Sequence, residues 1–263
     1  LMHVYLDAVF FPNIYQKEEI FRQEGWHYEL ENAEAPLKLN GVVYNEMKGA
    51  FSSPEEVLDR EVFNSLFPDT PYGVESGGDP NVIPELSYSE FLEFHKRYYH
   101  PVNSYIYLYG NMDMEERLNW MDEHYLSKYD ETVIDSAIPK QKAFDTVKEL
   151  IMEYPVSENE PEEENSYLSY NIVAGNSIDV EQNTAFDILD YTLLSAPGAP
   201  LKQALLDAGM GKDIMGSYED GIYQPFFSIV AKNADPKKKD EFVALIRSTL
   251  EEIVKKGIDK KAI

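Results

Sequence analysis

The chain has 263 residues, 43% of them hydrophobic and 19 of them Tyr, which is enough for one large domain or two moderate ones. It carries 48 Asp and Glu against 23 Lys and Arg, a formal net charge of −25, so nucleic acid and anionic membranes are excluded as partners. The chain contains no cysteine, so any metal ion has to be held by His, Asp or Glu.

The sequence also predicts a soluble chain. No apolar run approaches the roughly 20 residues of a membrane span, and no signal peptide opens the chain. The strong acidity is compatible with cationic peptides as substrates, although it is equally compatible with a role in solubility alone.

The first twelve residues, "LMHVYLDAVFFP", have the pattern of the last turns of a helix that ends before Pro12. At the other end, "KKGIDKKAI" reaches the start of a further element. We therefore expect this sequence to be a fragment of a longer polypeptide.

The stretch "GVVYNEMKGAF", residues 41–51, predicts a short helix with an acidic residue on its apolar side. Residues three and four apart are neighbours on a helix, so Glu46 shares a face with Val42, Val43, Gly49 and Ala50. Taken alone, such a glutamate is usually solvated or paired with a cation, because buried acids are rare.

Capping signals mark the next helices. Ser53-Pro54-Glu55-Glu56 opens a helix that runs to Phe67, and a capping box from Ser87 to Glu90 opens another over "YSEFLEFHKRYYH". The aromatic and β-branched stretch "SYIYLYGN", residues 104–111, predicts a strand, and Asp113 opens the helix that follows it.

Periodicity lapses from about residue 130 to residue 145, which predicts a linker between two α+β domains. In the second domain, "TVKELIMEY" and "SYLSYNIVA" predict strands separated by the acidic turn "SENEPEEE". Asp179 opens a helix, Asp220-Gly221 predicts a hairpin turn, and Asp235-Pro236 starts a long amphipathic helix that ends near Gly257.

Five stretches, in this order and spacing, resemble the presequence-protease branch of the pitrilysin and insulinase zinc metallopeptidases. They are "VYLDAVFFP", "FRQEGWHYELEN", "GVVYNEMKGAFS", the run from "YGVESGGDP" to "SYIYLYGN", and "GMGKDIMGSY". The resemblance implies two homologous sandwich-like domains, both incomplete here. Residues 1–130 would be the later part of the first, zinc-bearing domain, residues 131–145 the linker, and residues 146–263 most of the second, non-catalytic domain.

The resemblance also implies a zinc site. Family members bind zinc through two histidines of an H-x-x-E-H motif and a glutamate on a later helix, and by resemblance Glu46 in "YNEMKG" is that third ligand. Two imidazoles and one carboxylate leave an open position on zinc for water. None of the five histidines lies in an H-x-x-E-H motif, so we expect the general base upstream of this chain. Glu24 in "RQEGW" is a candidate for orienting a ligand histidine, or equally a structural partner of Arg22.

Three functional classes follow. The first is part of a zinc endopeptidase that degrades unfolded peptides in a closed chamber formed with the rest of the polypeptide, with this fragment inactive alone. The second is a non-catalytic relative of the same fold, and the third is a module that binds extended peptides at its sheet edges. The resemblance suggests an organelle for a eukaryotic source, whereas the absence of cysteine and the acidity also suit a bacterial cytoplasm.

Overall fold

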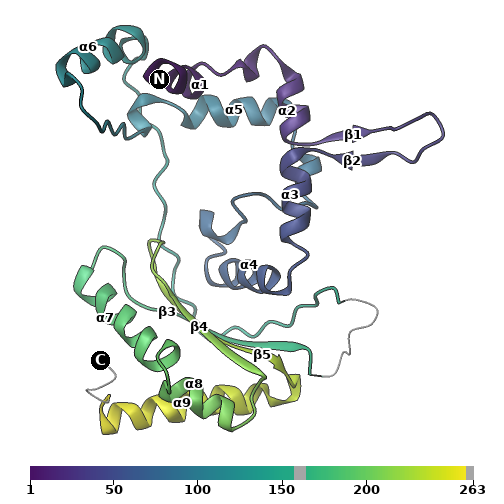
Figure 1. The fold of residues 1–263 in the computed structure, drawn as a ribbon, viewed down its shortest axis with the longest axis vertical. Helices are drawn as coiled ribbons and strands as arrows, with labels where there is room; N and C mark the ends of the chain where they lie inside the picture. The colour runs from purple at the N-terminus through teal and green to yellow at the C-terminus, as the bar shows by residue number, and fades with distance from the viewer. Residues whose placement is uncertain (157–163, 259–263) are drawn as a thin grey trace. The chain divides into compact units, whose positions relative to one another are not determined.

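The computed structural model describes residues 1–156 and 164–258, which form two compact units. Unit 1 comprises residues 1–53 and 75–137, and unit 2 comprises residues 54–74 and 138–263. Both contain helices and strands, so the predicted α+β class is confirmed (Figure 1).

Unit 1 is mainly helical. The expected opening helix is present as α1, and the helix that carries Glu46 is α3. The helices of the unit are α1 (Met2–Phe10), α2 (Glu18–Glu24), α3 (Val42–Ala50), α5 (Tyr88–Tyr98) and α6 (Met114–His124), with short 3₁₀ turns at Asn13–Tyr15, Ile83–Glu85, Pro101–Asn103 and Leu126–Lys128.

The strands of unit 1 form one two-stranded antiparallel ribbon. Strand β1 (His27–Glu29) pairs with β2 (Lys38–Asn40), with Tyr28 opposite Leu39. Tyr28, at 61% exposure, shows how little apolar surface the ribbon buries.

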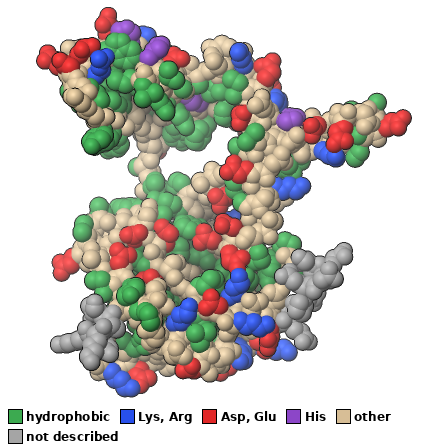
Figure 2. Space-filling model, in the orientation of Figure 1, with side chains coloured by type: hydrophobic (Ala, Val, Ile, Leu, Met, Phe, Trp, Pro, Cys, Tyr) green, Lys and Arg blue, Asp and Glu red, His purple; other side chains and the backbone are tan. Residues whose placement is uncertain are grey.

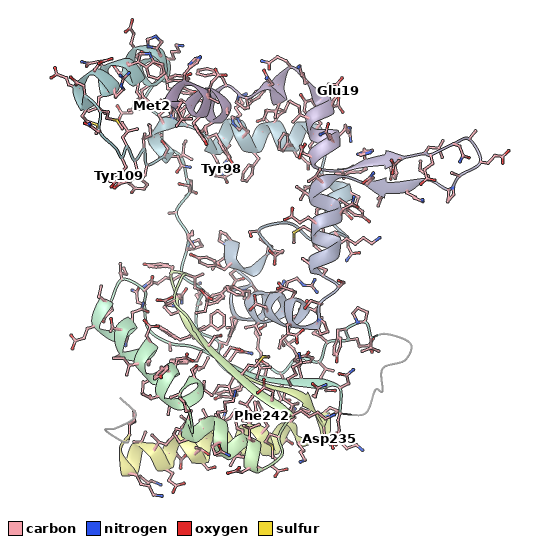
Figure 3. The ribbon with its side chains drawn as sticks, viewed as in Figure 1. Met2, Glu19, Tyr98, Tyr109, Asp235 and Phe242 are labelled. Carbon is pink, nitrogen blue, oxygen red and sulfur yellow. The ribbon has the colours of Figure 1, made fainter. Side chains whose placement is uncertain are left out.

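The predicted strand over residues 104–111 does not form, and this expectation is wrong for the structure. Residues 105–109 have no regular secondary structure, and Tyr105, Tyr107 and Tyr109 are almost fully exposed. Tyr109 is labelled in Figure 3. A strand requires a hydrogen-bonded neighbour, and the described residues offer none to this segment.

Unit 2 is built on a three-stranded antiparallel sheet with the order β3-β5-β4. Its strands are β3 (Ser166–Val173), β4 (Asp213–Glu219) and β5 (Phe226–Ala234), and the predicted hairpin turn at Asp220-Gly221 connects β4 to β5. Ser169 and Met215 both lie opposite Val230 of the central strand.

Helices cover both faces of this sheet. Side chains of α8 (Pro200–Asp207) and α9 (Lys239–Lys256) form one buried cluster with the sheet, and Phe242 of α9, labelled in Figure 3, is 1% exposed. Helix α4 (Pro54–Leu66) covers the other face through Val62 and the nearby Phe67, which pack with Phe226. The remaining elements are α7 (Val180–Asp190), a π turn at Tyr191–Ser195, and 3₁₀ turns at Pro71–Gly73 and Pro236–Lys238.

Helix α4 lies with unit 2, although the sequence analysis placed it with the first 130 residues. The two apolar residues Phe63 and Phe67 pack on Phe226, more than 150 positions later in the chain. The chain returns to unit 1 at residue 75. From residue 138, inside the expected linker, it belongs to unit 2. How these units correspond to the domains of the longer polypeptide stays a prediction.

The predicted strand over residues 146–154 is also absent from the structure, where this segment has no regular secondary structure. Residues 157–163 of the predicted acidic turn lie outside the described residues, as do residues 259–263 of the predicted final element.

Candidate metal centre

The helix that carries Glu46 is fixed at its start by a close backbone approach. Gly41 precedes α3 with φ of 149°, and a Cβ atom there would lie 2.2 Å from the carbonyl oxygen of Gly25. The backbone N–H of Tyr44 donates to that same oxygen at 3.3 Å. Only glycine fits this position, so it permits the close approach of the two backbones. The Tyr44 hydrogen bond then holds the end of α2 against the start of α3.

The opposite side of α3 packs against the loop that contains "ESGGDP". A Cβ atom on Gly77 would lie 2.3 Å from the sulfur of Met47, so the loop passes directly over this side chain. Gly78 N–H donates to the Glu75 carbonyl at 3.1 Å, so the stretch forms a turn.

The carboxylate of Glu46 is exposed to solvent. Its expected position on a buried face is wrong for this structure, since Val42 and Gly49 on the same face are exposed and Val43 and Ala50 are only half-buried. Within residues 1–156 and 164–258, no hydrogen bond or ion pair engages the Glu46 carboxylate. Neither Lys48 nor Arg22 is its partner. Arg22 is instead paired with Glu18 at 2.7 Å.

Glu24, the candidate for orienting a ligand, is the last residue of α2 and is also exposed. Its carboxylate accepts a hydrogen bond from the Gln23 side chain at 3.1 Å. The approach of Gly25 to Gly41 brings the α2 terminus to the start of α3, but the contacts of Glu24 in this structure are local.

The five histidines all have partners other than Glu46. His95, in the last turn of α5, is the most buried of them: Tyr15 Oη lies 2.8 Å from its Nδ1, and its Nε2 lies 2.9 Å from the Val9 carbonyl oxygen. The other contacts are His3 with Tyr125, His27 with the Arg22 carbonyl, His100 with the Val102 N–H, and His124 with the Trp120 carbonyl.

The described part of the chain therefore supplies one candidate zinc donor. It contains no group of three or more His, Asp or Glu side chains that could hold a metal ion. The type of donor fits zinc, since a carboxylate is an accepted third protein ligand, but a zinc site needs at least three protein ligands. The other ligands would have to come from outside these residues.

Among the described residues, the carboxylate whose pKa is shifted most lies in unit 2, and no sequence pattern singles it out. Glu55, in the first turn of α4, accepts hydrogen bonds from Lys232 of β5 and from Tyr167 of β3, the latter at 2.9 Å. The Lys232 hydrogen bond, followed by that of Tyr167, lowers the pKa of Glu55 to about 2. Such an arrangement ties α4 to the sheet, and nothing about it requires a ligand.

The fold defines a class of protein: an α+β chain of helices packed with antiparallel strands. A protein-family model described as "Peptidase M16 inactive domain" matches residues 85–263, more than half of the chain. This chain belongs to the peptidase M16 family.

The relatives agree with this assignment. "Protein HypA" of Clostridium perfringens is 51% identical over 263 residues, covering all of this chain and 27% of that protein. "Presequence protease 1, chloroplastic/mitochondrial" of Arabidopsis thaliana is 37% identical over 267 residues, covering all of this chain and 25% of that protein. The chain thus spans about a quarter of the length of these relatives, and its homologues include presequence proteases.

A solved structure supports the fold alone. The "peptidase M16 inactive domain from Pseudomonas fluorescens" aligns with a TM-score of 0.54 at 16% identity, covering 84% of this chain and 52% of that one. No helix among the described residues is long and apolar enough to cross a membrane.

Proposed function

We propose that this chain is part of a zinc-dependent endopeptidase that degrades unfolded peptides, and that it supplies Glu46 as the third protein ligand of zinc. The observation that carries the proposal is the state of Glu46. It is an exposed carboxylate with no partner among the described residues, on a helix whose start is fixed by Gly41.

Two further findings support the proposal. The presequence proteases among the relatives are peptidases by name, and their similarity to this chain includes residues 1–84, where Glu46 lies. Zinc, when bound, supplies Lewis-acid activation of water for peptide hydrolysis. The contribution of this chain would be to present one negatively charged oxygen donor from a rigid element.

The rest of the polypeptide would complete the site and the closed chamber around the substrate. The proposed substrates are unfolded peptides, with cationic ones favoured by the net charge of −25. We propose the cytoplasm as the location in a bacterium and an organelle in a eukaryote, since one relative bears a chloroplastic and mitochondrial name and another is clostridial.

The second candidate is a non-catalytic, structural or peptide-binding part of the same fold. The observation that favours it is the match of residues 85–263 to a domain described as inactive. It differs from the first candidate in what it expects of Glu46, which would then be dispensable for zinc binding.

The test replaces Glu46 by Gln in the protein expressed from its complete reading frame. The amide keeps the size of the side chain and removes the charge, so we expect zinc retention after dialysis and cleavage of an unstructured peptide to be lost together. Glu19→Gln is the matched control, because Glu19 is another exposed carboxylate of unit 1 and Figure 3 shows it on α2. Zinc content and activity at the control's level in Glu46→Gln would contradict the assignment and favour the second candidate.

A further inference from the structure

The residue before Glu46 is joined by side-chain hydrogen bonds to the β1–β2 ribbon. The Asn45 side-chain amide donates to Asn40 Oδ1 at 2.6 Å, and the Gly41 backbone N–H donates to the same oxygen at 2.8 Å. On its other side, Asn40 Nδ2 donates to the Glu29 carboxylate at 2.9 Å. The side chains of Glu29, Asn40 and Asn45 thus form a continuous connection from the ribbon to α3, which we call the Asn40 bridge.

The orientation of the Asn40 amide is fixed by the chemistry of its neighbours. A backbone N–H only donates, so the atom of Asn40 that faces Gly41 has to be the carbonyl oxygen. An ionised carboxylate only accepts, so the atom that faces Glu29 has to be the nitrogen, and the charge strengthens this bond. The Asn40 side chain therefore cannot turn over without losing both bonds.

The base of the ribbon is also held on its β1 side. His27 Nδ1 lies 2.7 Å from the Arg22 carbonyl oxygen of α2, and the Trp26 indole N–H donates to the Leu86 carbonyl at 2.9 Å. Asn40 lies opposite His27 in the register of the ribbon, which projects from the junction of α2 and α3 in Figure 1. The Asn40 bridge thus begins at a fixed point of unit 1.

Both chain neighbours of Glu46 are held in this way, although Glu46 is itself exposed. Successive residues lie about 100° apart around a helix axis, so Asn45 and Met47 lie on either side of Glu46. Asn45 is held by the Asn40 bridge, and Met47 lies under the loop at Gly77. Rotation of α3 about its axis would break these contacts, so they fix the direction in which the side chain of Glu46 leaves the helix.

We propose that Asn40 is a positioning residue for Glu46: the Asn40 bridge ties α3 to the β1–β2 ribbon and sets the direction in which the Glu46 carboxylate is presented to zinc. This inference rests on the proposed function of Glu46 as a ligand. The residues of the bridge act through the helix and are not ligands themselves. A ligand that is already oriented loses less conformational freedom when the metal binds.

The test reverses the hydrogen bond between Asn40 and Glu29 in the protein expressed from its complete reading frame. Asn40→Asp keeps the oxygen that accepts from Gly41 and Asn45, but it sets a second carboxylate against Glu29. Adding Glu29→Gln restores a donor and an acceptor in the opposite direction. Glu29→Gln alone still offers an oxygen to Asn40 and is the matched control.

The first measurement is the rate at which zinc is released into excess chelator. We expect release from Asn40→Asp to be about 10-fold faster than from the unsubstituted protein, the low end of the loss that follows removal of groups that orient a metal ligand. Release from Glu29→Gln and from the double variant should stay close to the unsubstituted rate. The negative charge added by Asn40→Asp would by itself favour a cation, so faster release cannot be a long-range effect of charge.

The second measurement is amide hydrogen exchange of the same proteins without zinc. We expect exchange over residues 42–50 of α3 to be faster in Asn40→Asp and to return to the unsubstituted rate in the double variant. Exchange over α9 of unit 2 is the internal control and should be the same in all of the variants.

The results separate this proposal from the proposed function. Unchanged zinc release from Asn40→Asp, or fast release that Glu29→Gln does not reverse, would overturn the positioning role of Asn40. Unchanged exchange of α3 in Asn40→Asp would overturn the Asn40 bridge itself. Zinc retained by Glu46→Gln would contradict the proposed function instead.

Discussion

Two segments of this chain begin with Ser-Tyr and continue with a strand pattern, yet they have different fates. Residues 166–173 of unit 2 become β3, paired along their length with β5. Residues 104–109 of unit 1 remain unpaired, with Tyr107 at 85% exposure. The comparison teaches that strand propensity expresses fit to a neighbouring strand and is not an intrinsic property of the segment.

The two units also differ in where their buried apolar clusters lie. The two buried clusters found in the described residues both lie in unit 2, on the two faces of its sheet. On the face of unit 1 seen in Figure 2, by contrast, many hydrophobic side chains are at the surface. Substitutions of the exposed apolar residues of unit 1 should therefore have much smaller effects than substitutions within the two clusters of unit 2.

The largest expected effect is that of Phe226→Ala in unit 2. Phe226 is 2% exposed and packs between Phe63 and Phe67, so its truncation leaves a cavity and should cost about 3–5 kcal/mol of unfolding free energy. The comparison in unit 1 is Phe94→Ala, where the side chain is 60% exposed and the cost should stay within about 0.5 kcal/mol. Urea unfolding followed by near-ultraviolet circular dichroism measures both variants, and similar losses would contradict the difference between the clusters of unit 2 and the exposed apolar residues of unit 1.

The next effect sharpens the comparison within unit 1. Gly41→Ala forces a Cβ atom against the Gly25 carbonyl in a backbone conformation that side chains rarely adopt, and should destabilise the unit by about 1–3 kcal/mol. Gly49→Ala, in the same helix, is the control. A Cβ atom at Gly49 meets nothing within 4 Å, so this substitution should raise the unfolding free energy by about 0.5–1 kcal/mol. Thermal unfolding of both variants checks the signs, and two shifts in the same direction would contradict the account of how α3 is held.

The smallest effect concerns the ion pair that ties α4 to the sheet of unit 2. The pKa of Glu55 is lowered from 4.5 to about 2, so the stabilisation is fully present above pH 4.5 and is lost as the pH falls through 2. Because the carboxylate is 40% exposed, solvent screening reduces the contribution to about 1 kcal/mol.

Lys232→Met removes the main cause of this pKa shift. We expect it to lower the unfolding free energy at pH 6 and to have a much smaller effect at pH 2, where most of this stabilisation is already lost. Lys96→Met is the control, because the Lys96–Glu93 pair of unit 1 is highly exposed and 3.9 Å apart. An equal loss from Lys232→Met at both pH values would show that the lysine acts through packing.

Local signals in the sequence predicted the element boundaries well. The Ser87 capping box, with Glu90 bonded to both its backbone and its side chain, starts α5 as expected. The Asp113 and Asp179 side chains accept from the backbone N–H three residues later and cap α6 and α7, and Gly257 with φ of 81° ends α9. These features depend on residues within one helical turn, so their information is contained in short stretches of sequence.

Long-range pairing could not be predicted from the same stretches. The position of α4 depends on Phe226 and Lys232, and no pattern near residue 60 indicates either of them. The exposure of Glu46 has the same origin, because the burial of a helix face depends on what lies against it. The family resemblance identified Glu46 as a candidate ligand. Its exposure and its lack of a partner among the described residues could be known only from the structure.

The most direct test of the central claim is to measure zinc in two proteins under the same dialysis conditions: the isolated 263-residue chain and the product of the complete reading frame. One carboxylate cannot hold zinc against water, so we predict no tightly bound zinc and no peptide cleavage for the isolated chain. For the complete protein we predict near-stoichiometric zinc and cleavage of an unstructured cationic peptide. Near-stoichiometric zinc on the isolated chain, or chelator-sensitive cleavage by it, would contradict the account and show that other residues of this chain form the site.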